Sequence, residues 1–216
     1  TSMPGSSIPP IRTSSFPVPA LPDTPDFPAL IASRICHDLI SPIGAIGNGL
    51  ELLVMSGAGG SGPELTLIND SVLQANARIR FYRIAFGVSA PGQQIGRTEI
   101  LSILSDMTAG SRLTLEWHIP PELPRVDAKL AFLILLCLET ALPYGGRVRL
   151  DSSYGRWTIT AHSLKLRHDP MLWSLVTDAR PGEEISPAQV QFLLLPDEIS
   201  EPIVQKVEAD AQPVIW

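Results

Sequence analysis

The ten residues Arg34-Ile35-Cys36-His37-Asp38-Leu39-Ile40-Ser41-Pro42-Ile43 set the plan of this chain. The apolar side chains among them belong to a longer stripe, which consists of Ile31, Ile35, Leu39, Ile43, Ile46, Leu50 and Leu53. Spacings of three and four place these residues on one face of a helix of about thirty residues. Thr24-Pro25-Asp26 supplies a capping hydroxyl, a proline for the first turn and an acid for the positive helix end. The helix is therefore predicted to begin near Thr24.

A second helix follows a glycine-rich break. Residues 57–62 interrupt the pattern, and Pro63-Glu64 restarts it. From there Leu65, Ile68, Val72, Ala75, Ile79, Tyr82 and Phe86 alternate at spacings of three and four, as in a coiled coil. Two such helices with a short connection predict an antiparallel hairpin. Because a lone hairpin leaves apolar surface uncovered, we expect it to form a homodimer through a four-helix bundle.

His37 is the first candidate for chemistry. At about 100° per residue, it points about 160° away from Ile35 and Leu39, off the apolar stripe. Its face also carries Arg34, Ile40, Ser41, Gly44, Asn48 and Glu51. Most of these side chains are small, so another protein could approach the imidazole closely. A neutral imidazole is a good nucleophile, and the adjacent Asp38 could orient the ring or take its proton. A surface histidine without chemistry is the alternative interpretation.

Arginines are expected near this histidine. The hairpin loop centres near residues 59–60, so His37 should lie level with Tyr82 on the second helix. Arg78, Arg80 and Arg83 surround that level. Because a phosphoryl group on His37 would carry about two negative charges, we predict that one of these arginines stabilises it or contacts an acidic partner, with Arg80 and Arg83 as the residues for receiver docking. An ordinary solvated face is the alternative.

The remaining chain alternates helices and strands. We predict helices over 99–107, 126–142, 169–178 and 186–195, and strands over 112–119, 146–151, 156–160 and near the C-terminus. The fold class is therefore α+β, with a small α/β sandwich after the hairpin. The predicted divisions are a disordered proline-rich arm (1–22), a helical hairpin (23–90) and the α/β domain (94–216).

Composition and net charge limit the classes of protein to which this chain could belong. The chain has 216 residues, of which 44% are hydrophobic, and a net charge of −6, which argues against a nucleic-acid partner. Its two cysteines are too few for a disulfide framework and favour the cytoplasm. We expect no signal peptide and no membrane span. The other histidines show no metal-ligand spacing, so no metal site is predicted.

The stretch around His37 resembles the H-box of sensor histidine kinases, in which His, an acid and Leu precede a polar residue and Pro. The helix over 127–146 has the position and shape of the kinase N-box helix, but Glu139-Thr140-Ala141-Leu142 replaces the usual Asn-Ala. No Asp-x-Gly-x-Gly follows the strand near 157–160, and no glycine-rich lid comes after it. The second domain therefore resembles a degenerate kinase ATPase domain without ATP binding.

This combination resembles the ChpT-like histidine phosphotransferases of bacterial phosphorelays. The matching residues are 36–45, 48–53, 80–87, and Leu142-Pro143 before Gly145-Gly146. The resemblance implies a homodimer whose His37, assisted by Asp38, accepts a phosphoryl group from the receiver domain of a hybrid kinase. His37 would then pass it to the receiver aspartate of a response regulator that governs the cell cycle. No cofactor is expected on this chain, because Mg²⁺ would come with the receiver.

Two other functions remain open from the sequence. The first is an ATP-dependent histidine kinase with unusual nucleotide motifs. The second is a non-catalytic dimeric adaptor that binds receiver domains.

Overall fold

The computed structural model describes residues 26–56, 62–153, 156–177, 185–198 and 214–215. The helices are α1 (Phe27–Ser56), α2 (Pro63–Ala85), α3 (Arg97–Thr108), α4 (Arg125–Ala141), α5 (Pro170–Thr177) and α6 (Val190–Glu198), with a 3-10 turn η1 (Pro187–Gln189). The strands are β1 (Gln94–Gly96), β2 (Leu113–His118), β3 (Glu122–Pro124), β4 (Gly146–Ser153), β5 (Arg156–His162) and β6 (Val214–Ile215). This arrangement confirms the predicted α+β class. The predicted arm (1–22) and most of the glycine-rich connection lie outside the described residues.

Helix α1 begins slightly later than the sequence predicts. The side chain of Asp26 accepts a hydrogen bond from the Ala29 backbone N–H at 3.1 Å, which is the bond a helix-capping residue makes. Asp26 is thus the cap, while Thr24 lies outside the described part of the chain. The helix then continues without interruption past Pro42, and His37, its eleventh residue, lies at the end of the third turn.

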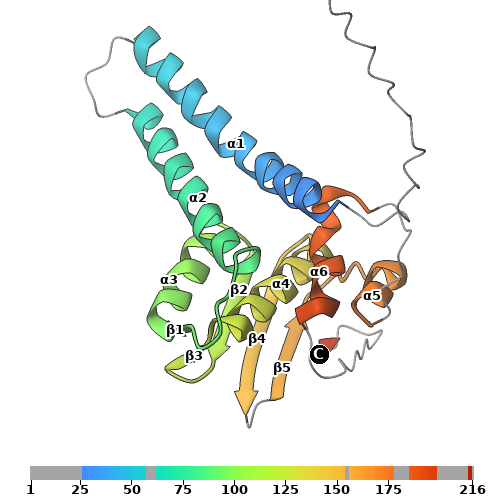
Figure 1. The fold of residues 1–216 in the computed structure, drawn as a ribbon. Helices are drawn as coiled ribbons and strands as arrows, with labels where there is room; N and C mark the ends of the chain where they lie inside the picture. The colour runs from blue at the N-terminus through green and yellow to red at the C-terminus, as the bar shows by residue number, and fades with distance from the viewer. Residues whose placement is uncertain (1–25, 57–61, 154–155, 178–184, 199–213, 216) are drawn as a thin grey trace, which may run out of the picture.

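The hairpin projects from the rest of the molecule as two antiparallel helices, α1 and α2 (Figure 1). The helices approach each other closely near its tip, at Gly49. A Cβ atom at Gly49 would lie 2.6 Å from Ile68 Cγ1, which is too close for any larger residue unless the Ile68 side chain or a helix shifts. Gly49 therefore sets the spacing of α1 and α2.

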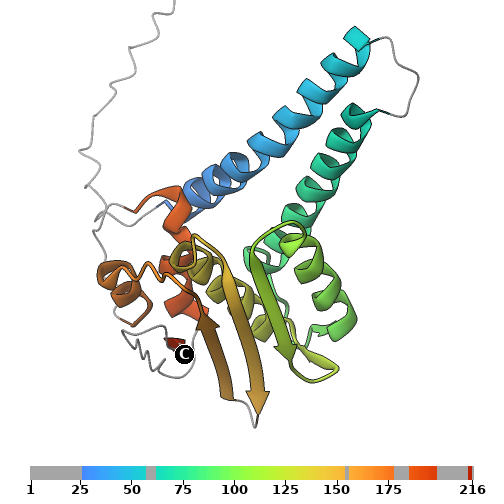
Figure 2. The same ribbon diagram turned by 180° about the vertical axis from the view of Figure 1, so that it is seen from behind.

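A four-stranded sheet of order β2-β4-β5-β6 forms the base of the molecule. Strands β2 and β4 are parallel, whereas β4 pairs antiparallel with β5. Strand β4 alternates buried Val148 and Leu150 with exposed Arg147 and Arg149, as expected when helices cover one face only (Figure 2). The short pair β1 and β3 was not predicted, because three residues are too few to show a periodic pattern.

The core joins the hairpin to the second part of the chain, which comprises the elements from β1 onward. Helix α4 is buried on most sides and occupies the centre of this core. The last turns of α2 enter the same core, where the ring of Phe81 stacks on Phe132 with centroids 4.6 Å apart. The second part of the chain therefore holds the C-terminal end of α2. The position of α1 next to this end decides which residues surround His37.

Much of the apolar surface of α1 is uncovered. Over Phe27–Met55 the helix is long and apolar enough to cross a membrane, with a mean hydropathy of 1.3, and only 11% of that window is buried. The expectation that no apolar segment reaches membrane-spanning length is therefore wrong for this helix, because its few charged residues do not offset the apolar ones around them. The same apolar residues would equally suit a protein partner along the hairpin.

Candidate functional site

The imidazole of His37 lies on the outside of α1. Its side chain is 81% exposed, and its Nδ1 atom lies 3.1 Å from Oδ1 of Asp38. An ionised carboxylate only accepts hydrogen bonds, so Nδ1 carries the proton and donates it. The other ring nitrogen, Nε2, is then unprotonated in the neutral ring and bears a free lone pair. Asp38 thus selects the tautomer in which the exposed nitrogen is the nucleophilic one.

Asp38 is held by a cluster of donors. Its side chain is only 10% exposed, and its Oδ2 atom accepts hydrogen bonds from Arg34 Nε at 2.8 Å, from Arg78 at 3.4 Å and from the Tyr82 hydroxyl. Burial alone would raise the pKa of Asp38. The hydrogen bonds from Tyr82 and His37 and the charges of Arg34 and Arg78 outweigh it, so the pKa of Asp38 lies below its ordinary value. The carboxylate is therefore ionised at neutral pH.

Tyr82 approaches the site from α2, at the level of His37 that the hairpin geometry predicts. The residue is 3% exposed, and its ring stacks on that of Phe86 with centroids 5.3 Å apart. Burial, together with the hydrogen bond donated to Asp38, raises the pKa of Tyr82 to about 12. The hydroxyl thus remains protonated and acts as a permanent donor to Asp38.

Arg34 does not lie on the open face as predicted. It is 8% exposed and turns inward, where its NH1 group donates to the Ala188 carbonyl of η1 at 2.7 Å. Its NH2 group lies 3.8 Å from Glu139 on α4. Docking of a partner directly on Arg34 is therefore excluded by burial. The spacing of Arg34 and Asp38, four residues apart on one helix, is a signal that could have indicated their pairing from the sequence.

Arg80 and Arg83 are not brought to His37. Arg80 donates to Asp106 at 2.6 Å and to Ser102 at 3.1 Å, both on α3, while Arg83 lies 3.4 Å from Glu99 of the same helix. Sharing a level on a hairpin is not enough, because residues two apart on a helix face different directions. Only Arg78, one of the three predicted arginines, reaches the site.

The remaining predicted docking residues form an open face beside His37. Ile40, Ser41, Gly44, Asn48 and Glu51 are all exposed. The side chain of Ile40 is an apolar projection on this face, since the residue is 69% exposed. A Cβ atom built on Gly44 would meet no atom within 4 Å. The face therefore offers a shallow, largely uncharged surface on which another protein could rest.

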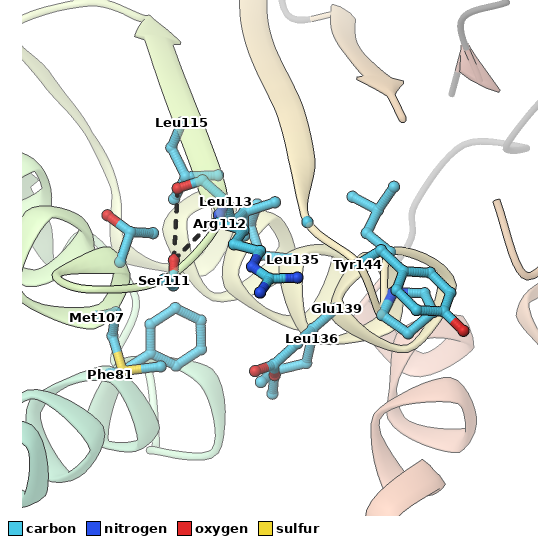
Figure 3. Close-up of a pocket in the computed structure, with 14 residues that line it drawn as sticks. Phe81, Met107, Ser111, Arg112, Leu113, Leu115, Leu135, Leu136, Glu139 and Tyr144 are labelled. Atoms are coloured by element: carbon cyan, nitrogen blue, oxygen red, sulfur yellow. Dashed lines mark hydrogen bonds between the residues drawn. The ribbon is translucent and has the colours of Figure 1, made fainter. Parts of the chain in front are cut away.

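A separate pocket of about 440 Å³ lies below the hairpin, between α2, α3, β2 and α4. Figure 3 shows Phe81 and Met107 at one end of it and Tyr144 at the other, with Glu139 between them. Neither His37 nor Asp38 lines this pocket. Glu139 connects the two regions, because it lies on the pocket wall and also faces Arg34.

No candidate metal cluster of three or more His, Cys, Asp or Glu residues occurs within the described part of the chain. In the stretch 139–142, which resembles the kinase N-box without its asparagine, the hydroxyl of Thr140 donates to the carbonyl of Cys137 in its own helix. The adjacent surface of α4 is covered by α6, from which the fully buried Gln191 donates to the Leu136 carbonyl at 3.4 Å. The Thr140 hydroxyl and the Leu136 carbonyl are therefore both bonded within the protein.

Comparison with known proteins gives consistent matches. Residues 97–201 match the family model of the histidine phosphotransferase C-terminal domain. Over 200 residues the chain is 36% identical to the protein phosphotransferase ChpT of Brucella abortus (strain 2308), a match that covers 88% of this chain and 94% of the relative. A solved bacterial phosphotransferase superposes with a TM-score of 0.70 at 36% identity, over 88% of this chain and 94% of that one.

Proposed function

Because this chain belongs to the ChpT family of histidine phosphotransferases, we propose that His37 carries the phosphoryl group in a bacterial phosphorelay. One observation supports this assignment above all others. His37 is exposed, and its Nδ1 atom faces an ionised, buried carboxylate at 3.1 Å, which favours the tautomer whose Nε2 carries the free lone pair. The group would come from the receiver domain of a hybrid kinase and pass to a receiver aspartate of a response regulator.

The proposed transfer uses the lone pair of Nε2. That nitrogen attacks the phosphorus of an aspartyl phosphate on the donor receiver, an N–P bond forms, and the P–O bond to the aspartate breaks. The positive charge that develops on the imidazole is stabilised by Asp38, which keeps its hydrogen bond from Nδ1–H. In the second half-reaction a carboxylate oxygen of the acceptor receiver attacks phosphorus, and the N–P bond returns its electrons to Nε2. Mg²⁺ is expected to arrive with the receiver.

The open face beside His37 is proposed to dock both receivers. Small residues at Ser41 and Gly44 permit close approach of a partner backbone, and Ile40 provides an apolar contact. Asn48 and Glu51 extend this face by a further two turns and supply polar contacts. Arg34 is left out of this surface because it is buried. Arg80 and Arg83 are left out because they face Asp106 and Glu99 on α3 and not His37.

A homodimer is proposed to cover the apolar surface of the hairpin. The exposed apolar side chains of α1 include Ile43, Leu50 and Val54, and α2 adds Val72 and Ile79. Their spacings of four and seven residues suit a helical seam, and packing against a second copy would produce a four-helix bundle. The proposal places the protein in the cytoplasm, with the apolar side chains of α1 covered by the second copy and not by a membrane.

The function is tested by transfer of labelled phosphate from a phosphorylated receiver. We expect wild-type protein to become labelled and His37→Ala to remain unlabelled, while His118→Ala, at a histidine whose side chain is half-exposed, becomes labelled normally. Equal labelling of wild type and His37→Ala would refute the proposal. Calorimetric titration with ATP tests the kinase alternative, which requires binding and autophosphorylation. An adaptor would bind the receiver without acquiring label.

A further inference from the structure

We infer that Arg34 is a positioning residue through which the second part of the chain holds the phosphoacceptor histidine in its reactive orientation. The inference rests on the proposed function of His37. It gives the second part of the chain a direct influence on phosphoryl transfer at His37, instead of a role in nucleotide binding.

The guanidinium of Arg34 connects three elements. Nε donates to Asp38 on α1 at 2.8 Å, NH1 donates to the Ala188 carbonyl of η1 at 2.7 Å, and NH2 faces Glu139 of α4 at 3.8 Å. Its side chain is 9% exposed, so these groups replace water as its partners. A rigid fork of donors cannot move toward one partner without leaving another. The location of η1 and α4 therefore fixes the direction in which Nε points.

Asp38 passes this constraint to His37. Its two oxygen atoms have separate tasks, since Oδ2 takes the bonds from Arg34, Arg78 and Tyr82 while Oδ1 faces the imidazole. Rotation of the carboxylate would break the Oδ2 bonds. Among the described residues, Asp38 is the one polar partner of the His37 ring. The ring orientation therefore depends on where Asp38 is held.

The connection to the second part is itself anchored in the core. The side-chain amide of Gln191 donates to the same Ala188 carbonyl at 2.9 Å, and Gln191 is fully buried. The Ala188 carbonyl thus accepts one bond from the core and one from Arg34. A shift of η1 relative to the hairpin would therefore move the Arg34 side chain, and Arg34 would in turn displace Asp38.

A matched pair of variants tests this connection from the second part. Glu139 and Glu99 have side chains that are 47% and 45% exposed, and each faces a hairpin arginine, but only the partner of Glu139 touches Asp38. For a half-exposed ion pair we expect Glu139→Gln to slow transfer at saturating donor about two- to threefold. Glu99→Gln should leave the rate unchanged. Neither change should alter the donor concentration that gives half the maximal rate.

Arg34→Lys tests the connecting side chain itself. One ammonium cannot reproduce the fork, so we expect the saturated transfer rate to fall about tenfold. Half-saturation should stay the same, because Arg34 is buried and cannot contact the receiver. The combined Arg34→Lys and Glu139→Gln variant should be no slower than Arg34→Lys alone, since Glu139 acts through Arg34. Additive slowing in the combined variant would overturn the inference.

Nitrogen NMR of the His37 ring gives a readout that needs no phosphoryl donor. Wild-type protein should show the Nδ1–H tautomer, and Arg34→Lys should show a mixture of both tautomers. A purely structural role of Arg34 would lower stability without changing the tautomer, and wild-type ring shifts in Arg34→Lys would overturn the inference. If wild-type protein took no label from the donor, the function of His37 would fail, but the ring shifts would still decide the role of Arg34.

Discussion

Replacing Tyr82 with phenylalanine removes one oxygen from the centre of the site and little else. The ring of Tyr82 is 3% exposed and is packed against Phe81 and Phe86, and these ring contacts would remain. What is lost is the hydrogen bond that the hydroxyl donates to Asp38. Tyr82→Phe therefore isolates the contribution of that bond to stability.

Two estimates bound the magnitude. The pKa of Tyr82 rises from 10.0 to about 12 on folding, first through burial and then through the hydrogen bond to Asp38, so the equivalent of about 3 kcal/mol, at about 1.4 kcal/mol per pKa unit, is an upper limit for that bond. Mutational data independently assign about 1.5–3 kcal/mol to a hydrogen bond that involves a charged group. We therefore expect the free energy of unfolding to fall by about 2–3 kcal/mol at neutral pH.

The pH dependence has a definite sign. The folded-state pKa of Tyr82 lies above its unfolded value, so the contribution is fully present below pH 10 and is lost as pH rises through about 12. Urea unfolding of both proteins, followed between about pH 8 and pH 12, should show the wild type losing its advantage over that interval. Tyr144→Phe, at a tyrosine that is 56% exposed, is the control and should change little.

A gap between wild type and Tyr82→Phe that stays constant from about pH 8 to pH 12 would refute the reasoning. It would mean that ionisation of Tyr82 does not destabilise the folded protein over this interval, which contradicts the raised pKa of the buried hydroxyl. A gap close to zero at neutral pH would show that the hydroxyl bond contributes nothing net.

Further predictions concern helix packing, the Asp38 carboxylate and the proposed dimer. Gly49→Ala should lower the unfolding free energy by about 1–3 kcal/mol, because its Cβ would meet Ile68 at 2.6 Å. Gly44→Ala, which meets no atom, should raise it by about 1 kcal/mol while increasing the receiver concentration needed for half-maximal transfer. Asp38→Asn should be about 3 kcal/mol less stable at neutral pH. That difference should shrink below about pH 4, because the folded-state pKa of Asp38 is lowered and its contribution disappears as pH falls. Ile43→Asp should leave the fold intact but give a monomer by light scattering, and a variant that stayed dimeric would contradict the proposed seam.

Patterns that repeat along the chain were predictable from the sequence. The apolar stripes through Ile35 and through Ile68 each extend over many turns, so the two long helices and their hairpin followed from periodicity alone. The exposure of His37 followed from the same angular count. Asp38 was identified because it adjoins His37, and the family resemblance lay in contiguous residues. Each of these features depends on near neighbours in the chain.

The tertiary structure decided which distant groups complete the site. Tyr82 lies 44 residues from Asp38 and Ala188 lies 154 residues from Arg34, and no local pattern reports such separations. Arg34 illustrates the difference. Its position on the helix placed it beside His37, and the sequence suggested that it would meet a partner there. A buried guanidinium must have its donors satisfied, and the carbonyl and carboxylates that satisfy them are assembled only when η1, α4 and α1 pack together. The sequence thus determined the reactive pair of His37 and Asp38, while long-range packing determined what holds that pair in place.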